Sequence, residues 1–80
     1  MRDGWVERGN RGAMDFVIAN GRREDVRLPC TVEAFLVARG LPPKTVVVEH
    51  NGEPVLHWEF ASRALASGDR LEVVRIVAGG

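Results

Sequence analysis

The residues best suited to do chemistry in this sequence of 80 residues are the last two, Gly79 and Gly80. Glycine has no Cβ, so a Gly-Gly end can extend, take positive φ and pass through a channel too narrow for other residues. The pair also leaves the carboxylate of Gly80 sterically open, and Ala78 before it is nearly as slim. We therefore expect the tail to be a reagent that another protein's active site activates and couples. The alternative is a frayed chain end, since disorder collects at termini.

Cysteine and histidine offer little further chemistry. Cys30 is the sole cysteine, which excludes an internal disulfide, and with His50 and His57 it does not make a zinc-ligand set. We expect the two histidines to lie on the surface at strand ends and Cys30 to be a small, partly buried filler. A persulfide relay at Cys30 is the alternative, because a helix N-terminus can lower the pKa of a thiol. No bound metal is predicted.

Ser62 and Ser67, with a histidine and Asp69, contain the ingredients of a hydrolytic triad. Neither serine lies in a recognisable strained turn that would expose a nucleophile. We therefore predict no catalytic residue, and the chain is not expected to be an enzyme.

Composition narrows the class of protein. Hydrophobic residues make up 45% and charged residues 28% of the chain, as in ordinary soluble globular domains. Eleven basic residues balance eleven acidic ones, so nucleic acid is a poor candidate partner. No run approaches the roughly 20 apolar residues of a membrane span, and no apolar stretch resembles a signal peptide. These features, with a single cysteine, predict a cytoplasmic protein.

Residues 1–13 are polar and glycine-rich without periodicity, and we expect a flexible leader followed by one domain over 14–80. Period-two alternation predicts a strand at 14–19, the Asn20-Gly21 pair predicts a tight turn, and a second strand is predicted at about 23–28. Pro29 should end that strand, since it has no amide hydrogen for the ladder.

A short amphipathic helix is predicted after Thr31, whose hydroxyl is placed to cap it. Gly40 is placed to close the helix in a left-handed conformation, and the following Pro42-Pro43 pair prevents its continuation. The β-branched run 45–49 lacks polar alternation, which predicts the central strand of the sheet, buried on both faces.

The remaining elements are shorter. Asn51-Gly52 predicts a second turn, and the strand at 55–56 should lie at an edge because Pro54 precedes it. Residues 58–66 indicate a helical turn or packed connection in which Trp58 and Phe60 belong to the core or its lid. The last strand is predicted at 71–77. The order is strand, strand, helix, strand, strand, strand.

An N-terminal hairpin, a crossing helix and a late central strand that runs into Gly-Gly describe the β-grasp, or ubiquitin-like, arrangement. Residues 14–80 resemble the ThiS family, the sulfur-carrier proteins of thiamine biosynthesis, which are similar to the MoaD-like carriers. The stretches that carry the resemblance are Asn20-Gly21, Leu28-Pro29, 31–36, 51–55, Trp58, 68–74 and 76–80.

The resemblance implies an α+β fold in which a mixed sheet of four to five strands packs on one main helix and ends in a flexible Gly-Gly tail. It also implies that an E1-like adenylating enzyme, using ATP and Mg²⁺, converts the Gly80 carboxylate to an acyl adenylate. Sulfur from a cysteine desulfurase then yields a thiocarboxylate, which is passed to thiazole synthase. Gly79 and Ala78 would thread the tail into each partner, and the chain itself would bind no cofactor.

A partner surface is expected on the sheet face that the helix leaves uncovered, where Val47, Val74 and Val77 place apolar side chains. Burial of these valines by the Trp58 segment is the alternative. Arg22, Arg23 and Arg27 form either a basic docking patch or an ordinary solvated strand face.

Three alternatives to the thiazole pathway stay open. The first is another carrier of the same fold, either the small subunit of molybdopterin synthase or a carrier for tRNA thiolation, and the chemistry of the tail would then be unchanged. A protein of another class, a ubiquitin-like modifier or interaction domain, would instead join Gly80 to a lysine through an isopeptide bond. In a purely structural domain, the third alternative, Gly79 and Gly80 would have no functional role.

Overall fold

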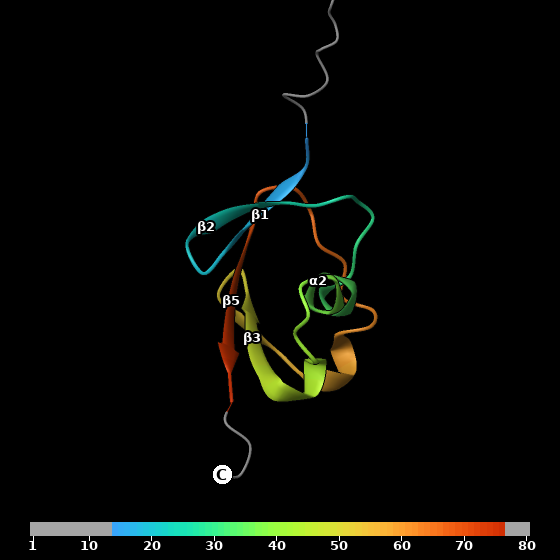
Figure 1. Ribbon diagram of the computed structural model, residues 1–80, viewed down its shortest axis with the longest axis vertical. Helices are drawn as coiled ribbons and strands as arrows, with labels where there is room; N and C mark the ends of the chain where they lie inside the picture. Colours follow the sequence, from blue (N-terminus) through green and yellow to red (C-terminus); the bar gives the residue numbers. More distant parts are fainter. Residues whose placement is uncertain (1–13, 77–80) are drawn as a thin grey trace, which may run out of the picture.

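Five strands and one α-helix form the part of the chain that the structure, a computed structural model, describes, residues 14–76 (Figure 1). The expected leader, residues 1–13, and residues 77–80 lie outside the described residues. The order of strands and helix is the predicted one. In chain order the elements are β1 (Phe16–Ala19), β2 (Arg22–Asp25), α2 (Val32–Ala38), the 3-10 turn η2 (Pro43–Thr45), β3 (Val46–His50), β4 (Glu53–Val55), the 3-10 turn η3 (His57–Glu59) and β5 (Asp69–Arg75).

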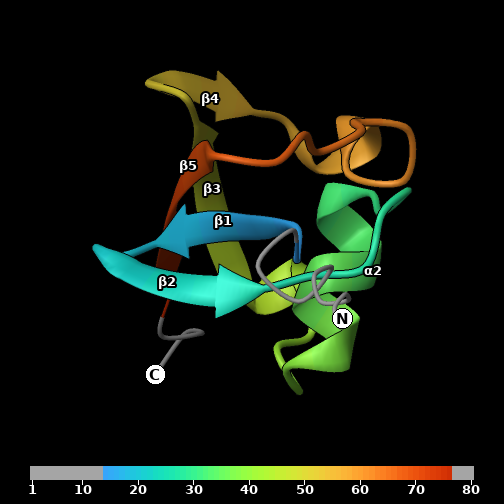
Figure 2. The ribbon, with the colours of Figure 1, turned by 90° about the horizontal axis from the view of Figure 1, so that it is seen from above.

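The strands make one mixed sheet in the order β2-β1-β5-β3-β4. The β1–β5 pair is parallel, and the other neighbouring pairs are antiparallel. The last strand therefore lies in the middle of the sheet, between strands from the two halves of the chain. Figure 2 shows α2 on one side of this sheet, and no described helix covers the other side.

Both Asn-Gly pairs form the turns that the sequence predicts. Asn20 and Gly21 have φ of 51° and 82°, and Asn51 and Gly52 have φ of 52° and 86°. Asparagine and glycine are the residues that tolerate this left-handed region, so each pair allows its strand to reverse within two residues.

The helix α2 begins and ends as predicted. The Thr31 Oγ1 accepts a hydrogen bond from the Ala34 amide at 3.1 Å, which caps the first turn. Gly40 has φ of 72° just beyond the helix, and Pro43 opens η2. The buried side chains of α2 pack against the sheet, so the helix is stabilised by tertiary contacts more than by its own seven residues.

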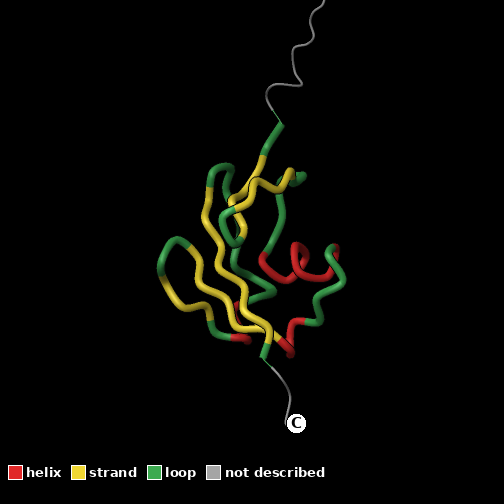
Figure 3. Tube along the Cα trace, turned by 60° about the vertical axis from the view of Figure 1, so that its left-hand side comes forward, coloured by secondary structure: helices red, strands yellow, loops and turns green. Residues whose placement is uncertain are grey.

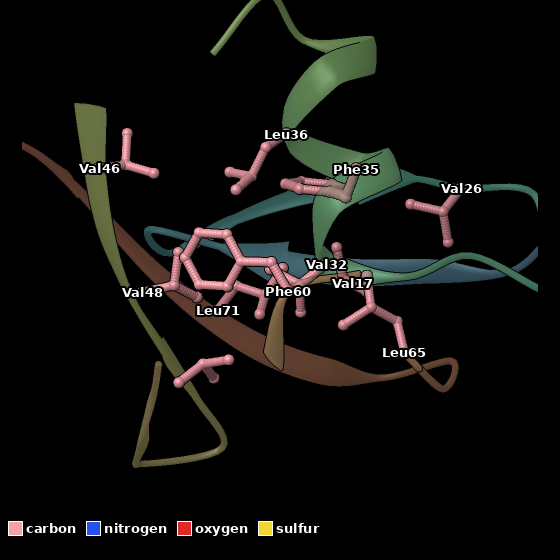
Figure 4. Packing of buried hydrophobic residues seen from close by; sticks show 11 residues of the cluster. Val17, Val26, Val32, Phe35, Leu36, Val46, Val48, Phe60, Leu65 and Leu71 are labelled. Carbon is pink, nitrogen blue, oxygen red and sulfur yellow. The ribbon is translucent and has the colours of Figure 1, made fainter. Parts of the chain in front are cut away.

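The core lies between α2 and the sheet, and Figure 4 shows its side chains converging from both layers. Phe35 and Phe60 are the largest buried side chains. Each phenylalanine or leucine side chain that is fully buried contributes roughly 1.5–3 kcal/mol to the stability of the fold. The other core members are Val17, Val26, Val32, Leu36, Val46, Val48, Val55, Leu65 and Leu71.

Two predictions about the strands are wrong. The run at 45–49 was expected to be central and buried on both faces, but β3 alternates between buried and exposed residues, and β5 holds the central place. The β-branched composition masked this alternation, because Val47 is as apolar as its buried neighbours although it faces outward. The second strand also ends earlier than expected, at Asp25.

Phe60 and Trp58 have opposite environments. Phe60 is 2% exposed and belongs to the core, as predicted, whereas Trp58 is 79% exposed and does not. The η3 turn brings only one of these two aromatic rings under the helix, because residues two apart on a 3-10 turn point in different directions.

Candidate functional site

The end of β5 is the place from which the chain continues to Gly80. There the amide of Ile76 donates a hydrogen bond to the carbonyl oxygen of Thr45 at 2.7 Å, so the last described residue is tied to η2. Figure 3 shows the end of this strand beside η2. Gly80 is the fourth residue after Ile76, and like Ala78 and Gly79 it lies outside the described residues.

Asparagine side chains extend the pairing of β5 on both sides. Its parallel pairing with β1 ends where Ala19 faces Leu71. Beyond that point the side-chain amide of Asn20 makes the hydrogen bonds that a neighbouring strand would make. Its Oδ1 accepts from the Val73 amide at 2.7 Å, and its Nδ2 donates to the Val73 carbonyl at 3.0 Å. On the other side the Asn51 Oδ1 accepts from the Arg70 amide at 2.8 Å. The strand that leads to the tail is therefore fixed along both edges.

The predicted partner surface is exposed on the uncovered face of the sheet. Val47 and Val74 face each other across β3 and β5, and they are 47% and 56% exposed. The Trp58 segment does not bury them. Val77, the third predicted member, lies outside the described residues. Leu56 and Ile76, which the sequence did not single out, are further exposed apolar side chains near this end of the sheet.

Two glutamates border the same surface. Val47, Leu56 and Val74 line a shallow concavity of about 480 Å³ together with Glu49 and Glu72. The alternation within β3 and β5 places these carboxylates on the outer face. Sequence reasoning missed Glu49 because it assigned residues 45–49 to a strand buried on both faces, and it missed Glu72 because only the strand register places it opposite Glu49.

His50 is not the surface histidine that was expected. It is buried, with 8% of its surface exposed, and its Nε2 lies 2.6 Å from the Asp69 Oδ2. The Arg63 Nε donates to the His50 Nδ1 at 3.0 Å, so Nδ1 is the acceptor and the ring proton is on Nε2. Burial alone would raise the pKa of Asp69, but hydrogen bonds from His50, the Ala66 amide and Asn51 outweigh it and lower that pKa.

Among the hydrogen bonds of residues 14–76, none joins Ser62 or Ser67 to a histidine, as a hydrolytic triad would require. Both ring nitrogens of His50 are occupied, and the Ser67 Oγ accepts a hydrogen bond from the Phe16 amide at 3.2 Å. The ring of the other histidine, His57, is bonded through Nε2 to the Val46 carbonyl at 2.9 Å. These contacts stabilise the fold.

The remaining candidate residues have ordinary surroundings. Cys30 is partly buried against the core, and its thiol donates to the Thr31 carbonyl at 3.4 Å, which fits the predicted filler role. Arg23 stacks over the Phe16 ring and pairs with Asp25.

Within residues 14–76, no group of three or more His, Cys, Asp and Glu side chains is placed to hold a metal ion. No helix in the same range is long and apolar enough to cross a bilayer.

A mixed five-stranded sheet on one helix, with an uncovered face and a central strand that leads to a Gly-Gly end, defines a ubiquitin-like β-grasp protein. The family follows from the sequence comparison. The profile of the ThiS family matches residues 16–80, and the chain belongs to this family of sulfur carriers.

Two known proteins illustrate the relationship. The chain is similar to the thiamine biosynthesis protein ThiS of Geobacter metallireducens, whose crystal structure superposes with a TM-score of 0.70 at 26% identity over 81% of this chain and 99% of that one. It is also 36% identical over 64 residues to the thiazole synthase of Paramagnetospirillum magneticum. That match covers 80% of this chain but 20% of the relative, so the chain spans about a fifth of the length of the curated relative it matches.

Proposed function

We propose that this chain carries sulfur as a thiocarboxylate on Gly80 and donates it to the formation of the thiazole of thiamine. The observation that carries the proposal is the path of β5. The central strand of a ThiS-family fold is fixed along both edges, is tied to η2 through Ile76, and leads within four residues to Gly80.

In the proposed cycle the chain is the substrate of its partners and not the catalyst. A carboxylate oxygen of Gly80 attacks the α-phosphorus of ATP on an E1-like adenylating enzyme, with Mg²⁺, and pyrophosphate leaves. The terminal sulfur of a persulfide, formed by a cysteine desulfurase, then attacks the acyl carbon and displaces AMP. A thiol cleaves the resulting S–S bond and leaves the thiocarboxylate. Since this chemistry needs ATP and reduced thiols, we assign it to the cytoplasm.

The sequence similarity to a thiazole synthase supports thiazole formation as the destination of the sulfur. The relative from Paramagnetospirillum magneticum contains a stretch similar to this carrier and is itself called a thiazole synthase. A carrier segment within such a chain is expected if the two act on each other. We therefore propose a thiazole synthase as the sulfur acceptor. Sulfur transfer to a molybdopterin synthase large subunit or to tRNA thiolation would instead assign the chain to another pathway.

The tail and the uncovered sheet face have different roles in this proposal. Ala78 and Gly79 give the reach and slimness to enter an active site, and Gly80 supplies the reacting carbonyl. Val47 and Val74, with Val77 following them, form the apolar surface on which the partners dock. No side chain of the carrier has to do acid or base chemistry.

Intact-protein mass spectrometry tests the proposal. The chain is incubated with ATP, Mg²⁺, its adenylating enzyme, a cysteine desulfurase and cysteine. We expect a mass gain that corresponds to one oxygen replaced by sulfur, and its absence in a variant that lacks Gly80. A conjugate on a lysine with no thiocarboxylate would instead identify a modifier, and an unchanged mass would refute the proposal.

A further inference from the structure

The chain contains a single lysine, Lys44, and its other ten basic residues are arginines. A lysine amine that has lost its proton attacks acyl groups and forms stable amides with them, whereas the guanidinium of arginine keeps its proton in proteins. The sequence therefore offers a side-chain amine at one position only.

Lys44 lies at the point where the chain leaves the sheet toward Gly80. It is the middle residue of η2, and the carbonyl of the next residue, Thr45, accepts the hydrogen bond from the Ile76 amide at 2.7 Å. Figure 3 shows the end of β5 beside this turn. The amine is thus carried by the residue adjacent to the one that anchors the base of the tail.

The side chain of Lys44 is available for reaction. It is exposed, and among the ion pairs of residues 14–76 none includes it. Lys44 lines an open concavity of about 640 Å³ together with Glu33 and with the apolar side chains of Pro43 and Trp58. A segment of small residues that returned toward η2 would therefore have room beside the amine.

The chain beyond Ile76 is long enough to make this return. The four residues that follow span at most about 13 Å, whereas hydrogen-bonded backbones such as those of Ile76 and Thr45 lie only about 5 Å apart. Glycine at the last two positions permits the change of direction that the approach requires. An amine and an acyl group joined by so short a tether meet at an effective concentration on the order of millimolar.

We propose that Lys44 is an internal acylation site, which the activated Gly80 of the same chain modifies. The inference rests on the proposed function, because adenylation of Gly80 supplies the activated acyl group. The lone pair of the Lys44 Nζ attacks the acyl carbon, and the bond from this carbon to the phosphate oxygen breaks. AMP leaves, and the nitrogen releases a proton to water. The product is an amide that closes a ring between Lys44 and Gly80.

This closure competes with sulfur transfer only for an adenylate that has left its partner. A tail that is extended into a partner's active site holds its acyl carbon away from Lys44. An adenylate that dissociates before a persulfide arrives is instead consumed by the amine. The closed chain has no terminal carboxylate and cannot be adenylated again, so a shortage of sulfur withdraws the carrier from the cycle.

The experiment uses the full chain with a thioester at Gly80, prepared by cleavage of an intein fusion with a small thiol, so that no partner enzyme is needed. At mildly alkaline pH we expect a product lighter by one water than the unmodified chain, formed at a rate independent of protein concentration. Tandem mass spectrometry should locate the new amide between Lys44 and Gly80. Hydrolysis to the free acid alone, or a product that forms only at high protein concentration, would overturn the inference.

Two variants test whether the position of the amine matters. Lys44→Arg keeps the positive charge but removes the amine, so its thioester should only hydrolyse. Adding Arg27→Lys to Lys44→Arg restores the composition and moves the lysine to an exposed position just beyond β2. That position is near the start of β5, because Asp25 faces Phe16, whose carbonyl accepts from the Gly68 amide. We expect no closure in this double variant, and closure equal to that of the unmodified chain would overturn the inference.

A second assay separates this inference from the function on which it rests. Exchange of pyrophosphate with ATP, dependent on the carrier and its adenylating enzyme, reports adenylation of Gly80. If the thioester closes but the chain supports no exchange, the proposed function fails and the reactivity of Lys44 stands. If exchange occurs but the thioester does not close, the function stands and the acylation site does not.

Discussion

The Nε2 atom of His50, at the end of β3, lies 2.6 Å from the Oδ2 atom of Asp69, at the start of β5. Asp69 also accepts hydrogen bonds from the Ala66 amide at 2.8 Å and from the Asn51 side chain at 3.2 Å. One carboxylate thus joins the end of a strand, a turn and the loop that enters the central strand. We expect this pair to control how the stability of the fold depends on pH.

Stability should fall at acid pH through Asp69. Its pKa is lowered in the folded chain, so its carboxylate contributes stability above the unfolded pKa of about 3.9. That contribution is lost as pH falls through this value and then through the lower folded pKa. Asp69→Asn should lower the free energy of unfolding by about 1–3 kcal/mol at neutral pH, and it should make the decrease in stability at acid pH less steep. Urea unfolding of the unmodified chain and of the variant at a series of pH values measures this difference. An equal decrease in stability at acid pH in both would contradict the prediction.

The side chain of Asn20 should stabilise the strand that leads to the tail. Asn20→Asp keeps the acceptor for the Val73 amide but replaces the donor to the Val73 carbonyl with an oxygen, so two oxygens then face each other. We expect a loss of about 1 kcal/mol, since the position is exposed and water compensates part of the change. Hydrogen exchange should show faster exchange of the Val73 amide in the variant. Equal protection would mean that this bridge contributes nothing.

The two aromatic residues near η3 should respond oppositely to truncation. Phe60→Ala opens a cavity in the core and should cost about 3–5 kcal/mol. Trp58→Ala removes a side chain that is 79% exposed and should change the free energy of unfolding by less than about 0.5 kcal/mol. Denaturant unfolding compares them directly, and a large loss in the Trp58 variant would show that its ring packs on the fold.

Charge on the uncovered sheet face should block the partner without unfolding the carrier. Val74→Glu places a carboxylate in the apolar patch, and we expect binding of the adenylating enzyme to weaken at least about tenfold. Val37→Glu is the matched control, because Val37 is 60% exposed but lies on α2, on the other side of the sheet. Circular dichroism should be the same for both variants. If the Val74 variant bound as tightly as the control, the patch would not be a partner surface.

The sequence by itself determined the elements with local signals. The Asn-Gly turns, the Thr31 cap and the glycine beyond the helix each reflect backbone preferences within a few residues, so element order and the α+β class could be predicted. The Gly-Gly end and the family resemblance can also be recognised from the linear sequence. The role of Gly80 follows from them and stays a prediction.

Only the tertiary structure decided which residues face each other. The valine run of β3 hides its alternation, so nothing in it distinguishes the buried Val46 and Val48 from the exposed Val47. The burial of His50 depends on Asp69, and the opposition of Glu49 and Glu72 depends on strand register, across separations of 19 and 23 residues. Pairing at such distances along the chain is set by packing of the whole sheet against the helix and not by local preference.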